Sequence, residues 1–562
     1  MKNFLFVVPR FALPGQYYVF PNGLAYVISY MKHKGFNVFC LNLCHHDESI
    51  EYLLNESIKN NNIDVLCTGA MSFYWNEVNE VLETARKIKP EIVTVVGGAI
   101  ITSDPRLALE NMHIDFGVIG EGEETMAELA DALDNGKNIY NVKGITFFER
   151  EKNLITTEHR PPILDLDSLP FPDYEGLEFD KWLSNKWIMQ PSIGGLLFDV
   201  DDEQRLCEIS ASRSCPYQCT FCYHPLGNIY RQRSLDNVFK EIDYLVEKYN
   251  ITLLNLLDEL FSANEKRIYE FTDRIGKYNI RWMAQWRVNN VNEKMLKVMK
   301  DSGILMIGLG VESLNDKVLK SMKKKITKSE IERAYKLSLD VGVRACSNII
   351  LGDPEETEET INESLEWWRK HQEYDINLGF LIAVPDSQVW QYAIANNMIE
   401  DKVQFIRDKF PVINLTKLSD KKFNEIKTKV DYYVLSQKYL ISGRVLTSKR
   451  EAEVYNGKNI YSFRVECPTC RQISEYKHIR YTSAPYLVVL CKNCYKRVKI
   501  KTKKAYPGDY NEFAYGFMFH YAFIFYNIYL KKHNSFKGIA KILKKSLQRL
   551  GMSGYAGWLG DR

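Results

Sequence analysis

The chain has 562 residues, 45% of them hydrophobic, which is enough to build several domains with buried cores. Its formal net charge is only +3, so the overall charge gives no reason to expect a nucleic-acid partner. The opening apolar run stops at Pro9, which is too short for a secretory signal, and we expect a cytoplasmic protein that begins with a buried strand. Twelve cysteines, most of them grouped, then indicate metal sites in a reducing compartment.

Residues 1–155 alternate short apolar runs with segments of helical periodicity. This pattern predicts an α/β fold with a Rossmann-like, doubly wound parallel sheet, in which ligands bind at the carboxyl ends of the strands. Glycines follow several of the predicted strands, either because a bulky ligand needs the backbone close or because the chain only turns tightly there. The strands are expected at 4–8, 37–43, 64–70, 92–98 and 115–123, and the candidate cofactor-binding residues after them are Gly69, Gly97, Gly98, Gly120 and Glu121.

A second β–α series follows a linker that is rich in proline and acidic residues. We place the linker at residues 156–194 and the second series at 195–415. Six β–α units in this length predict a partial (β/α)6 barrel, similar to part of a TIM barrel, with its chemistry at the carboxyl ends of the strands. The strands are expected at 207–215, 253–261, 281–288, 304–313, 343–354 and 376–386.

Three cysteines with the spacing CxxxCxxC end the first strand of this second series, in "RSCPYQCTFCYHP". Thiolates this close together on one loop can bind one metal centre, and zinc or an iron–sulfur cluster is the usual choice. Structural zinc requires four ligands, and the nearby His224 lies only two residues from Cys222. A four-iron cluster held by Cys215, Cys219 and Cys222 would leave one iron open for a small molecule, which is the more economical interpretation.

This cysteine spacing, the aromatic Phe221 before the third cysteine and the position after a first strand resemble the radical SAM superfamily. The resemblance implies that Cys215, Cys219 and Cys222 hold a 4Fe–4S cluster and that the open iron binds S-adenosylmethionine. Reductive cleavage would then give a 5′-deoxyadenosyl radical. Such an enzyme needs an electron donor, so a flavodoxin-type or ferredoxin-type partner is expected.

The same resemblance implies further cofactor-binding residues at later strand ends. For the acidic residues the alternative is a helix cap or a solvated loop. Arg231 and Arg233 are candidates for pairing with a carboxylate or phosphate. The implied cofactor-binding residues are Asp258, Glu259, Glu312, Ser313 and Gly352.

Residues 20–175 resemble the cobalamin-binding domains that precede such barrels, through "FPNGLAYVISYMKHKGFNV", "VVGGAIITSDPRLALEN", "IDFGVIGEGEETMAEL" and "DLDSLPFP". Methionine-synthase-like domains carry a DxHxxG histidine below the cobalt, and the loop after the first strand here has no histidine. The lower face of the cofactor is therefore left undefined. His45 and His46 are either contacts of the cofactor or exposed loop residues.

The last part of the chain changes character. Residues 416–460 are expected to be helical, and residues 461–505 hold two CxxC pairs separated by twenty residues, which fits a zinc ribbon. Four thiolates favour structural zinc, with an auxiliary iron–sulfur cluster as the alternative. In residues 506–562 an aromatic run precedes a basic one, which predicts two helices or attachment to an anionic membrane surface. The four proposed ligands are Cys467, Cys470, Cys491 and Cys494.

These features together predict a cobalamin-dependent radical SAM enzyme, in the first place a methyltransferase acting on an unactivated carbon of a small biosynthetic molecule. Cobalamin-assisted cyclisation, rearrangement or oxidation without methyl transfer is the alternative, because the whole group shares these motifs. A non-catalytic cofactor sensor or nucleic-acid-binding module is a third interpretation. The intact CxxxCxxC motif argues against it, since a binding module needs no open iron.

Overall fold

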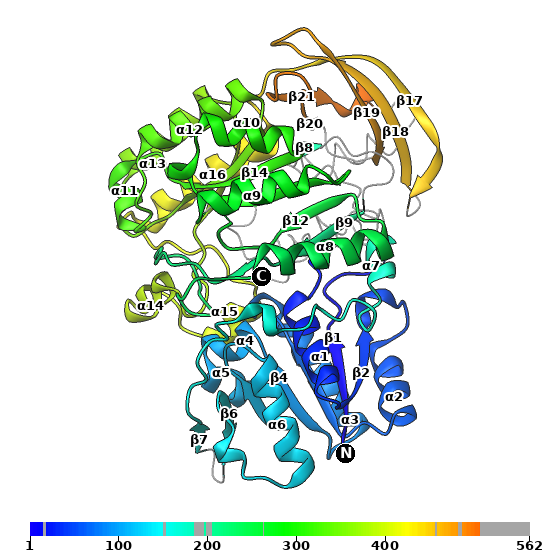
Figure 1. The fold of residues 1–562 in the computed structure, drawn as a ribbon. Coiled ribbons are helices and arrows are strands. Elements are labelled where there is room, and N and C mark those ends of the chain that lie inside the picture. The colour runs from blue at the N-terminus through cyan, green and yellow to red at the C-terminus, as the bar shows by residue number, and fades with distance from the viewer. Residues whose placement is uncertain are drawn as a thin grey trace.

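The structure is a computed structural model that describes residues 1–14, 18–149, 153–184, 196–197, 205–261, 263–455, 458–480 and 486–505. Figure 1 shows two α/β units, one above the other, with a β-rich C-terminal part beside the upper unit. The predicted helices of the C-terminal tail, residues 506–562, lie outside the described residues. Within the described part of the chain, no helix is both long enough and apolar enough to cross a bilayer.

The first unit is the predicted doubly wound sheet, with strand order β2-β1-β3-β4-β5-β6-β7. Its first five strands are parallel, and β6 and β7 add an antiparallel edge. Alternate residues of β1 face opposite sides: Phe4 and Phe6 pack with the helices α1 and α6, and Leu5 and Val7 pack with α2 and α3. The strands are β1 (Asn3–Val8), β2 (Asn37–Asn42), β3 (Val65–Gly69), β4 (Val93–Gly97), β5 (Phe116–Val118), β6 (Ile145–Phe148) and β7 (Leu154–Thr156), and the helices are α1 (Asn22–His33), α2 (Ile50–Asn60), α3 (Trp75–Ile88), α4 (Ala99–Ser103), α5 (Pro105–Asn111) and α6 (Glu123–Asn135).

The second unit is a six-stranded sheet whose strands follow one another in chain order, β9-β12-β13-β14-β15-β16, all parallel. This is the order that a partial barrel requires, and its curvature into a barrel stays a prediction. The strands are β9 (Leu206–Ile209), β12 (Leu253–Leu256), β13 (Arg281–Trp286), β14 (Ile304–Glu312), β15 (Ala345–Leu351) and β16 (Asp375–Phe380). The helices are α8 (Leu235–Tyr249), α9 (Glu265–Ile275), α10 (Glu293–Asp301), α11 (Asp316–Ser321), α12 (Lys328–Val341), α13 (Glu358–Lys370), α14 (Gln388–Ala395), α15 (Lys402–Arg407) and α16 (Asp420–Ser436).

The two faces of this second sheet differ in polarity. Trp282, Ile307 and Ile376 are buried against the helices in the same core as the first unit. On the opposite face, the neighbouring Asn348 and Asn377 are exposed carboxamides. One side of the sheet therefore packs throughout, whereas the other has a small apolar cluster at Leu206, Leu253 and Met283 and polar side chains nearer the carboxyl ends of the strands.

The described part of the predicted linker, residues 156–184, contacts both units, and part of it is helical, in α7 (Phe179–Ser184). Phe20 of the first unit contacts Phe179 with ring centroids 5.1 Å apart. The buried Tyr174 hydroxyl donates to Glu241 of α8 at 2.7 Å. These contacts fix the two units against each other through the segment that joins them.

The C-terminal part departs from the sequence prediction. Residues 416–460 are helical only in α16, and from Arg444 the chain forms β17. The residues of β17 up to Arg450 are largely exposed and show no strong apolar alternation, so the strand depends on its pairing with β18 and not on its own pattern. The remaining elements are β17 (Arg444–Tyr455), β18 (Lys458–Glu466), β19 (Ile473–Arg480), β20 (Tyr486–Leu490), β21 (Arg497–Lys501) and α17 (Thr502–Ala505), and the short β8 (Leu196–Leu197) pairs with β20.

Candidate functional site

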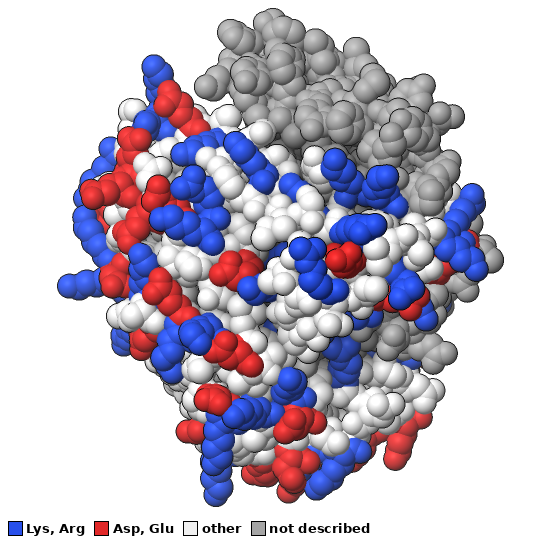
Figure 2. Space-filling view, turned by 90° about the horizontal axis from the view of Figure 1, so that it is seen from above, with Lys and Arg blue, Asp and Glu red and all other residues white. Residues whose placement is uncertain are grey.

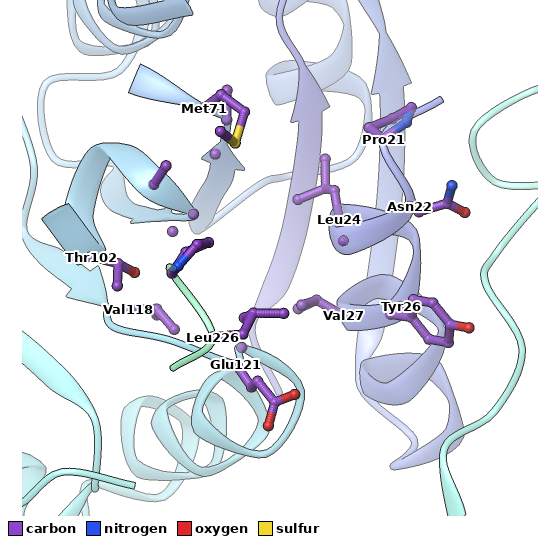
Figure 3. Close-up of a pocket in the computed structure, with 18 of the residues that line it drawn as sticks. Pro21, Asn22, Leu24, Tyr26, Val27, Met71, Thr102, Val118, Glu121 and Leu226 are labelled. Atoms are coloured by element: carbon purple, nitrogen blue, oxygen red, sulfur yellow. The ribbon is translucent and has the colours of Figure 1, made fainter. Parts of the chain in front are cut away.

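A cavity of about 460 Å³ lies between the two α/β units. It is lined by the carboxyl ends of β3, β4 and β5, by the first turns of α1 and by residues that follow β9 and β12. Figure 3 shows Leu24 and Val27 of α1 on one side of the cavity, with Met71 and Thr102 on the other. All five residues predicted at the strand ends of the first unit line it, namely Gly69, Gly97, Gly98, Gly120 and Glu121.

The glycines of the cavity serve two different purposes. A Cβ atom on Gly69 would lie 2.6 Å from the Gly97 carbonyl oxygen, and one on Gly98 would lie 2.8 Å from that of Ala70. These glycines are therefore required by the close approach of β3 and β4. By contrast, a Cβ atom on Gly120 or Gly23 would meet no atom within 4 Å, although Gly120 also has a left-handed backbone with φ of +73°.

Gly23 was not singled out from the sequence. It lies in the first turn of α1, has no left-handed backbone and lines the cavity. Glycine lowers the stability of a helix. A glycine at the start of a predicted helix is therefore the signal in the sequence that points to a special role. The open space above Gly23 and Gly120, next to apolar side chains such as Leu24 and Val27, forms a cradle that fits a wide, flat cofactor.

The two histidines that follow β2 do not line this cavity. The His45 ring contacts the Tyr18 hydroxyl through Nε2 at 2.9 Å and Glu178 through Nδ1 at 3.2 Å. His46 also lies near Glu178, at 3.8 Å. Both residues thus tie the first unit to the segment that precedes the second, and no histidine is among the described residues that line the cavity.

The three clustered cysteines lie on a loop that is closed by an antiparallel pair, β10 (Ser212–Arg213) with β11 (Arg231–Gln232). The Cys222 thiol hydrogen bonds to Cys219, and this contact lowers the pKa of Cys219, assisted by the positive charges of Lys324 and Arg287. Cys215 interacts electrostatically with Cys219. Burial raises the pKa of Cys215, and the contact with Cys219 raises that of Cys222. Three thiols on one short loop fit the ligand set of a 4Fe–4S cluster.

The cysteine loop is anchored on both sides by backbone hydrogen bonds. Thr220 N–H donates to the Met322 carbonyl at 3.2 Å, and Val389 N–H donates to the Thr220 carbonyl at 3.0 Å. Ser214, Pro225 and Leu226, at the two ends of this loop, also line the cavity. The loop that carries the three cysteines and the strand ends of the first unit therefore border one shared space.

An ion network closes the edge of the cavity between the two units. The Glu121 carboxylate accepts hydrogen bonds from Arg213 and Arg231, both at 2.8 Å, and from the Ile163 N–H at 2.7 Å. Arg213 also pairs with Glu123 at 2.5 Å. Burial acts to raise the pKa of Glu121, but the Arg213 guanidinium and these hydrogen bonds hold it below its ordinary value.

The residues that the family resemblance implied at later strand ends divide into two groups. Glu259 lines the cavity and lies 3.6 Å from His224, and Glu312 pairs with Lys324 at 2.7 Å. These two acids lie beside the cysteine loop. Asp258 is different, because its carboxylate accepts hydrogen bonds from the backbone of Ala211 and from Ser212, and so holds the loop that follows β9.

The remaining implied residues are also engaged within the protein. Ser313 is buried, and its hydroxyl accepts a hydrogen bond from Asn315 N–H. Gly352 has a left-handed backbone with φ of +109° and donates its N–H to Glu356 at 2.5 Å. Arg233, a candidate for binding an anion, is buried and pairs with Glu241. These three residues therefore shape the scaffold of the second unit.

The four C-terminal cysteines converge as the spacing predicts. One ligand atom from each of the four thiols lies within 4.8 Å of the other three. None of these cysteines forms a disulfide. This second cluster belongs to the β-rich part of the chain.

Comparison with known proteins gives two family matches that coincide with the two units. The chain matches the B12 binding domain over residues 13–130 and the radical SAM superfamily over residues 209–367. It is 31% identical over 396 residues to "Uncharacterized methyltransferase PH0819" of Pyrococcus horikoshii, which covers 67% of this chain and 79% of the relative. It is 28% identical over 381 residues to the anaerobic magnesium-protoporphyrin IX monomethyl ester cyclase of Rubrivivax gelatinosus, which covers 66% of each chain.

Two solved structures have a similar fold. The radical S-adenosylmethionine methyltransferase TsrM of Kitasatospora setae superposes with a TM-score of 0.55 at 18% identity, covering 70% of this chain and 77% of its own. The cobalamin-dependent radical enzyme OxsB superposes with a TM-score of 0.56 at 14% identity, covering 98% of this chain and 75% of its own. The predicted α/β architecture is thereby confirmed, and with the sequence matches it leads to one conclusion: the chain belongs to the cobalamin-dependent radical SAM enzymes.

Proposed function

We propose that this enzyme binds cobalamin in the cavity between its two α/β units and methylates an unactivated carbon of a small biosynthetic molecule. The observation that carries the proposal is the shared border of the cavity, where the cysteine loop meets the glycine cradle of the first unit. Relatives named as methyltransferases support it, among them PH0819 and the cytidylyl-2-hydroxyethylphosphonate methyltransferase of Streptomyces wedmorensis.

The residues of the chain would hold the cofactors and exclude water. Cys215, Cys219 and Cys222 would bind the 4Fe–4S cluster, with one iron left for S-adenosylmethionine. Gly23 and Gly120 would allow the corrin ring to lie against the backbone. When bound, these groups supply hydrogen abstraction and methyl transfer, which no side chain can perform.

The polar face of the second sheet would receive the substrate. Gln285, Asn348 and Asn377 are exposed carboxamides on strands β13, β15 and β16. Such groups orient a small molecule by hydrogen bonds without adding charge. An electron donor of the flavodoxin or ferredoxin type would act as the second partner.

Methyl transfer is tested with S-adenosylmethionine labelled in its methyl group. The reconstituted enzyme, kept anaerobic and supplied with a reductant, is expected to transfer label to its bound cobalamin. S-adenosylmethionine would have two roles, as methyl donor to cobalamin and as radical source at the cluster. A Cys219→Ala variant separates them, because it should lose the product formation that needs the cluster. Enzyme that binds cobalamin and never acquires label would contradict methyl transfer.

A second candidate is radical oxidation or cyclisation with cobalamin but without methyl transfer. Relatives named as anaerobic magnesium-protoporphyrin IX monomethyl ester cyclases favour it. The same labelling experiment distinguishes the two candidates, since a cyclase would turn over substrate while its cobalamin stays unlabelled.

A further inference from the structure

The C-terminal cysteine cluster has the dimensions of a tetrahedral metal site. The sulfur atoms of Cys467 and Cys494 are 3.7 Å apart, and those of Cys470 and Cys491 are 3.6 Å apart. A zinc ion about 2.3 Å from four tetrahedral sulfurs would separate them by about 3.8 Å. The observed spacing therefore leaves room for one ion at the centre and is too long for disulfides.

The two CxxC turns that supply these thiols have the same local structure. In the first, Arg471 N–H donates to the Cys467 carbonyl at 3.0 Å, and in the second, Tyr495 N–H donates to the Cys491 carbonyl at 2.9 Å. Arg471 and Tyr495 both have left-handed backbones, with φ of +63° and +56°. Such a conformation is unfavourable for these residue types, and its occurrence at equivalent positions indicates that each turn is shaped to aim its thiols.

The surroundings of the cluster suit a negatively charged metal centre. Four thiols that bind Zn²⁺ release four protons, which leaves a centre with a net charge of −2. The basic residues Arg471, Lys492 and Lys496 lie within or directly after the two turns. The Ser474 hydroxyl lies 3.9 Å from the Cys491 sulfur and accepts a hydrogen bond from Lys492 N–H.

The second CxxC turn leads directly into a contact with the sheet of the radical SAM unit. Arg497 begins β21, three residues after Cys494, and is buried. Its guanidinium donates to the Ile376 carbonyl of β16 at 3.1 Å and is attracted by the Asp375 carboxylate. The Asp375 carboxylate also pairs with Arg344, which directly precedes β15, at 2.6 Å.

We propose that Cys467, Cys470, Cys491 and Cys494 bind one structural zinc ion, and that this ion holds Arg497 against the start of β16. The zinc site would thereby fasten the β-rich part to the catalytic sheet. All four ligand positions are taken by the protein, so the ion has a structural role and does not bind substrate. This site is separate from the cysteine loop and stands independently of the proposed methyl transfer.

Metal analysis tests the site itself. A full-length variant with Cys215, Cys219 and Cys222 all changed to Ala removes the other cluster, so that any metal counted belongs to the C-terminal cysteines. One zinc per chain is expected after dialysis, and a further Cys491→Ser change should abolish it, whereas a Cys40→Ser change in β2 should not. Stoichiometric iron in place of zinc, or no bound metal, would overturn the proposal.

Hydrogen exchange tests the fastening of β16. Amides of residues 375–380 are expected to exchange at least tenfold faster in Cys467→Ser and in Arg497→Met than in the wild type. Cys467 lies on the first CxxC turn, so its change does not alter the turn that precedes Arg497. Arg497→Met should keep its zinc, and Lys501→Met, at the exposed end of the same strand, should leave both zinc and exchange unchanged. Unchanged exchange in a zinc-free variant, or faster exchange that extends equally to β1, would rule out the fastening role.

Discussion

Glu121 is one of the residues that join the two α/β units directly. Its carboxylate, on the first unit, binds Arg213 and Arg231 of the second, and all three side chains are almost fully buried. A buried charge that loses its partner is left uncompensated in a medium of low dielectric constant. Within this network, a single carboxylate links the strand end of the first unit to two guanidinium groups of the second.

Replacing Glu121 with Gln keeps the shape of the side chain and removes its charge. We expect the free energy of unfolding to fall by about 3 kcal/mol, because the buried Arg231 then loses its carboxylate partner and Arg213 keeps only Glu123. Urea denaturation measures this change. The matched Glu124→Gln variant, whose carboxylate is largely solvated beside Arg160, should lose less than about 1 kcal/mol. Equal losses in the two variants would contradict the account of this network.

Glu356 is a buried acid whose protonation depends on pH near neutrality. Burial raises the pKa of Glu356 to about 8 from its ordinary value of 4.5, and the neighbouring Asp353 adds to the rise. Between these two values the folded protein holds a proton that the unfolded chain does not. Stability should therefore fall as the pH rises from about 4.5 towards 8.

The Glu356→Gln variant is expected to lose this dependence. Its free energy of unfolding should change less with pH than that of the wild type. Between pH 4.5 and 8 the two slopes should differ by at most about 1.4 kcal/mol for each pH unit. Chemical denaturation at several values from pH 5 to 8 measures the difference. Glu359 is exposed, so Glu359→Gln is the control and should follow the wild type. A Glu356→Gln profile that runs parallel to the wild type would show that Glu356 is ionised in the folded protein.

At the scale of elements, the strand ends of the first unit combine two kinds of glycine. The sequence predicts that glycines follow β3, β4 and β5, and it leaves open whether each one turns the chain or makes room for a ligand. The structure separates the two, since Gly69 is enclosed by backbone, whereas a Cβ atom on Gly120 would meet open space, as it would on Gly23 at the start of α1. Such a distinction depends on atoms from other strands, which no local pattern encodes.

The two kinds of glycine should respond differently to a single methyl group. Gly69→Ala is expected to destabilise the protein by about 1 to 3 kcal/mol, because its Cβ would lie 2.6 Å from a backbone oxygen that cannot move freely. Gly23→Ala should be neutral or stabilising by up to about 1 kcal/mol, because alanine is the better helix former. Thermal unfolding of the two variants distinguishes them, and similar melting temperatures would contradict the roles assigned here.

The elements that could be predicted are those with their own periodicity. The apolar strands of both α/β units and the amphipathic helices between them follow the sequence pattern closely. The strand β17 does not follow its own pattern, because it is stabilised by its pairing with β18. The sequence predicts a helix there. The hydrogen bonds from Ala211 and Ser212 to Asp258 could not be predicted either, because they join segments far apart in the sequence, and a role of Asp258 in cofactor binding stays a prediction.

At the scale of the whole molecule, the two units meet with their strand ends around one cavity. The two sheets could be predicted from the apolar periodicity, and the two groups of cysteines from their spacing. Their mutual arrangement could not, because it rests on contacts such as Phe20 N–H to Glu208, across 188 residues of sequence. On the face shown in Figure 2, acidic and basic side chains of the described residues are interspersed, in keeping with the small net charge.

The cofactor content per chain tests the central claim most directly, that two cofactor sites share one cavity. Any metal bound by the four C-terminal cysteines is subtracted first. After anaerobic reconstitution, the enzyme should then contain one cobalamin and about four irons per chain. Gly23→Leu should lose cobalamin and keep its iron, because the new side chain fills the cradle, whereas His33→Leu, at the exposed end of the same helix, should keep both. Cys219→Ala should show the reverse, with cobalamin retained and iron lost. A Gly23→Leu enzyme that binds cobalamin as the wild type does, or a Cys219→Ala enzyme that keeps its cluster, would contradict this account.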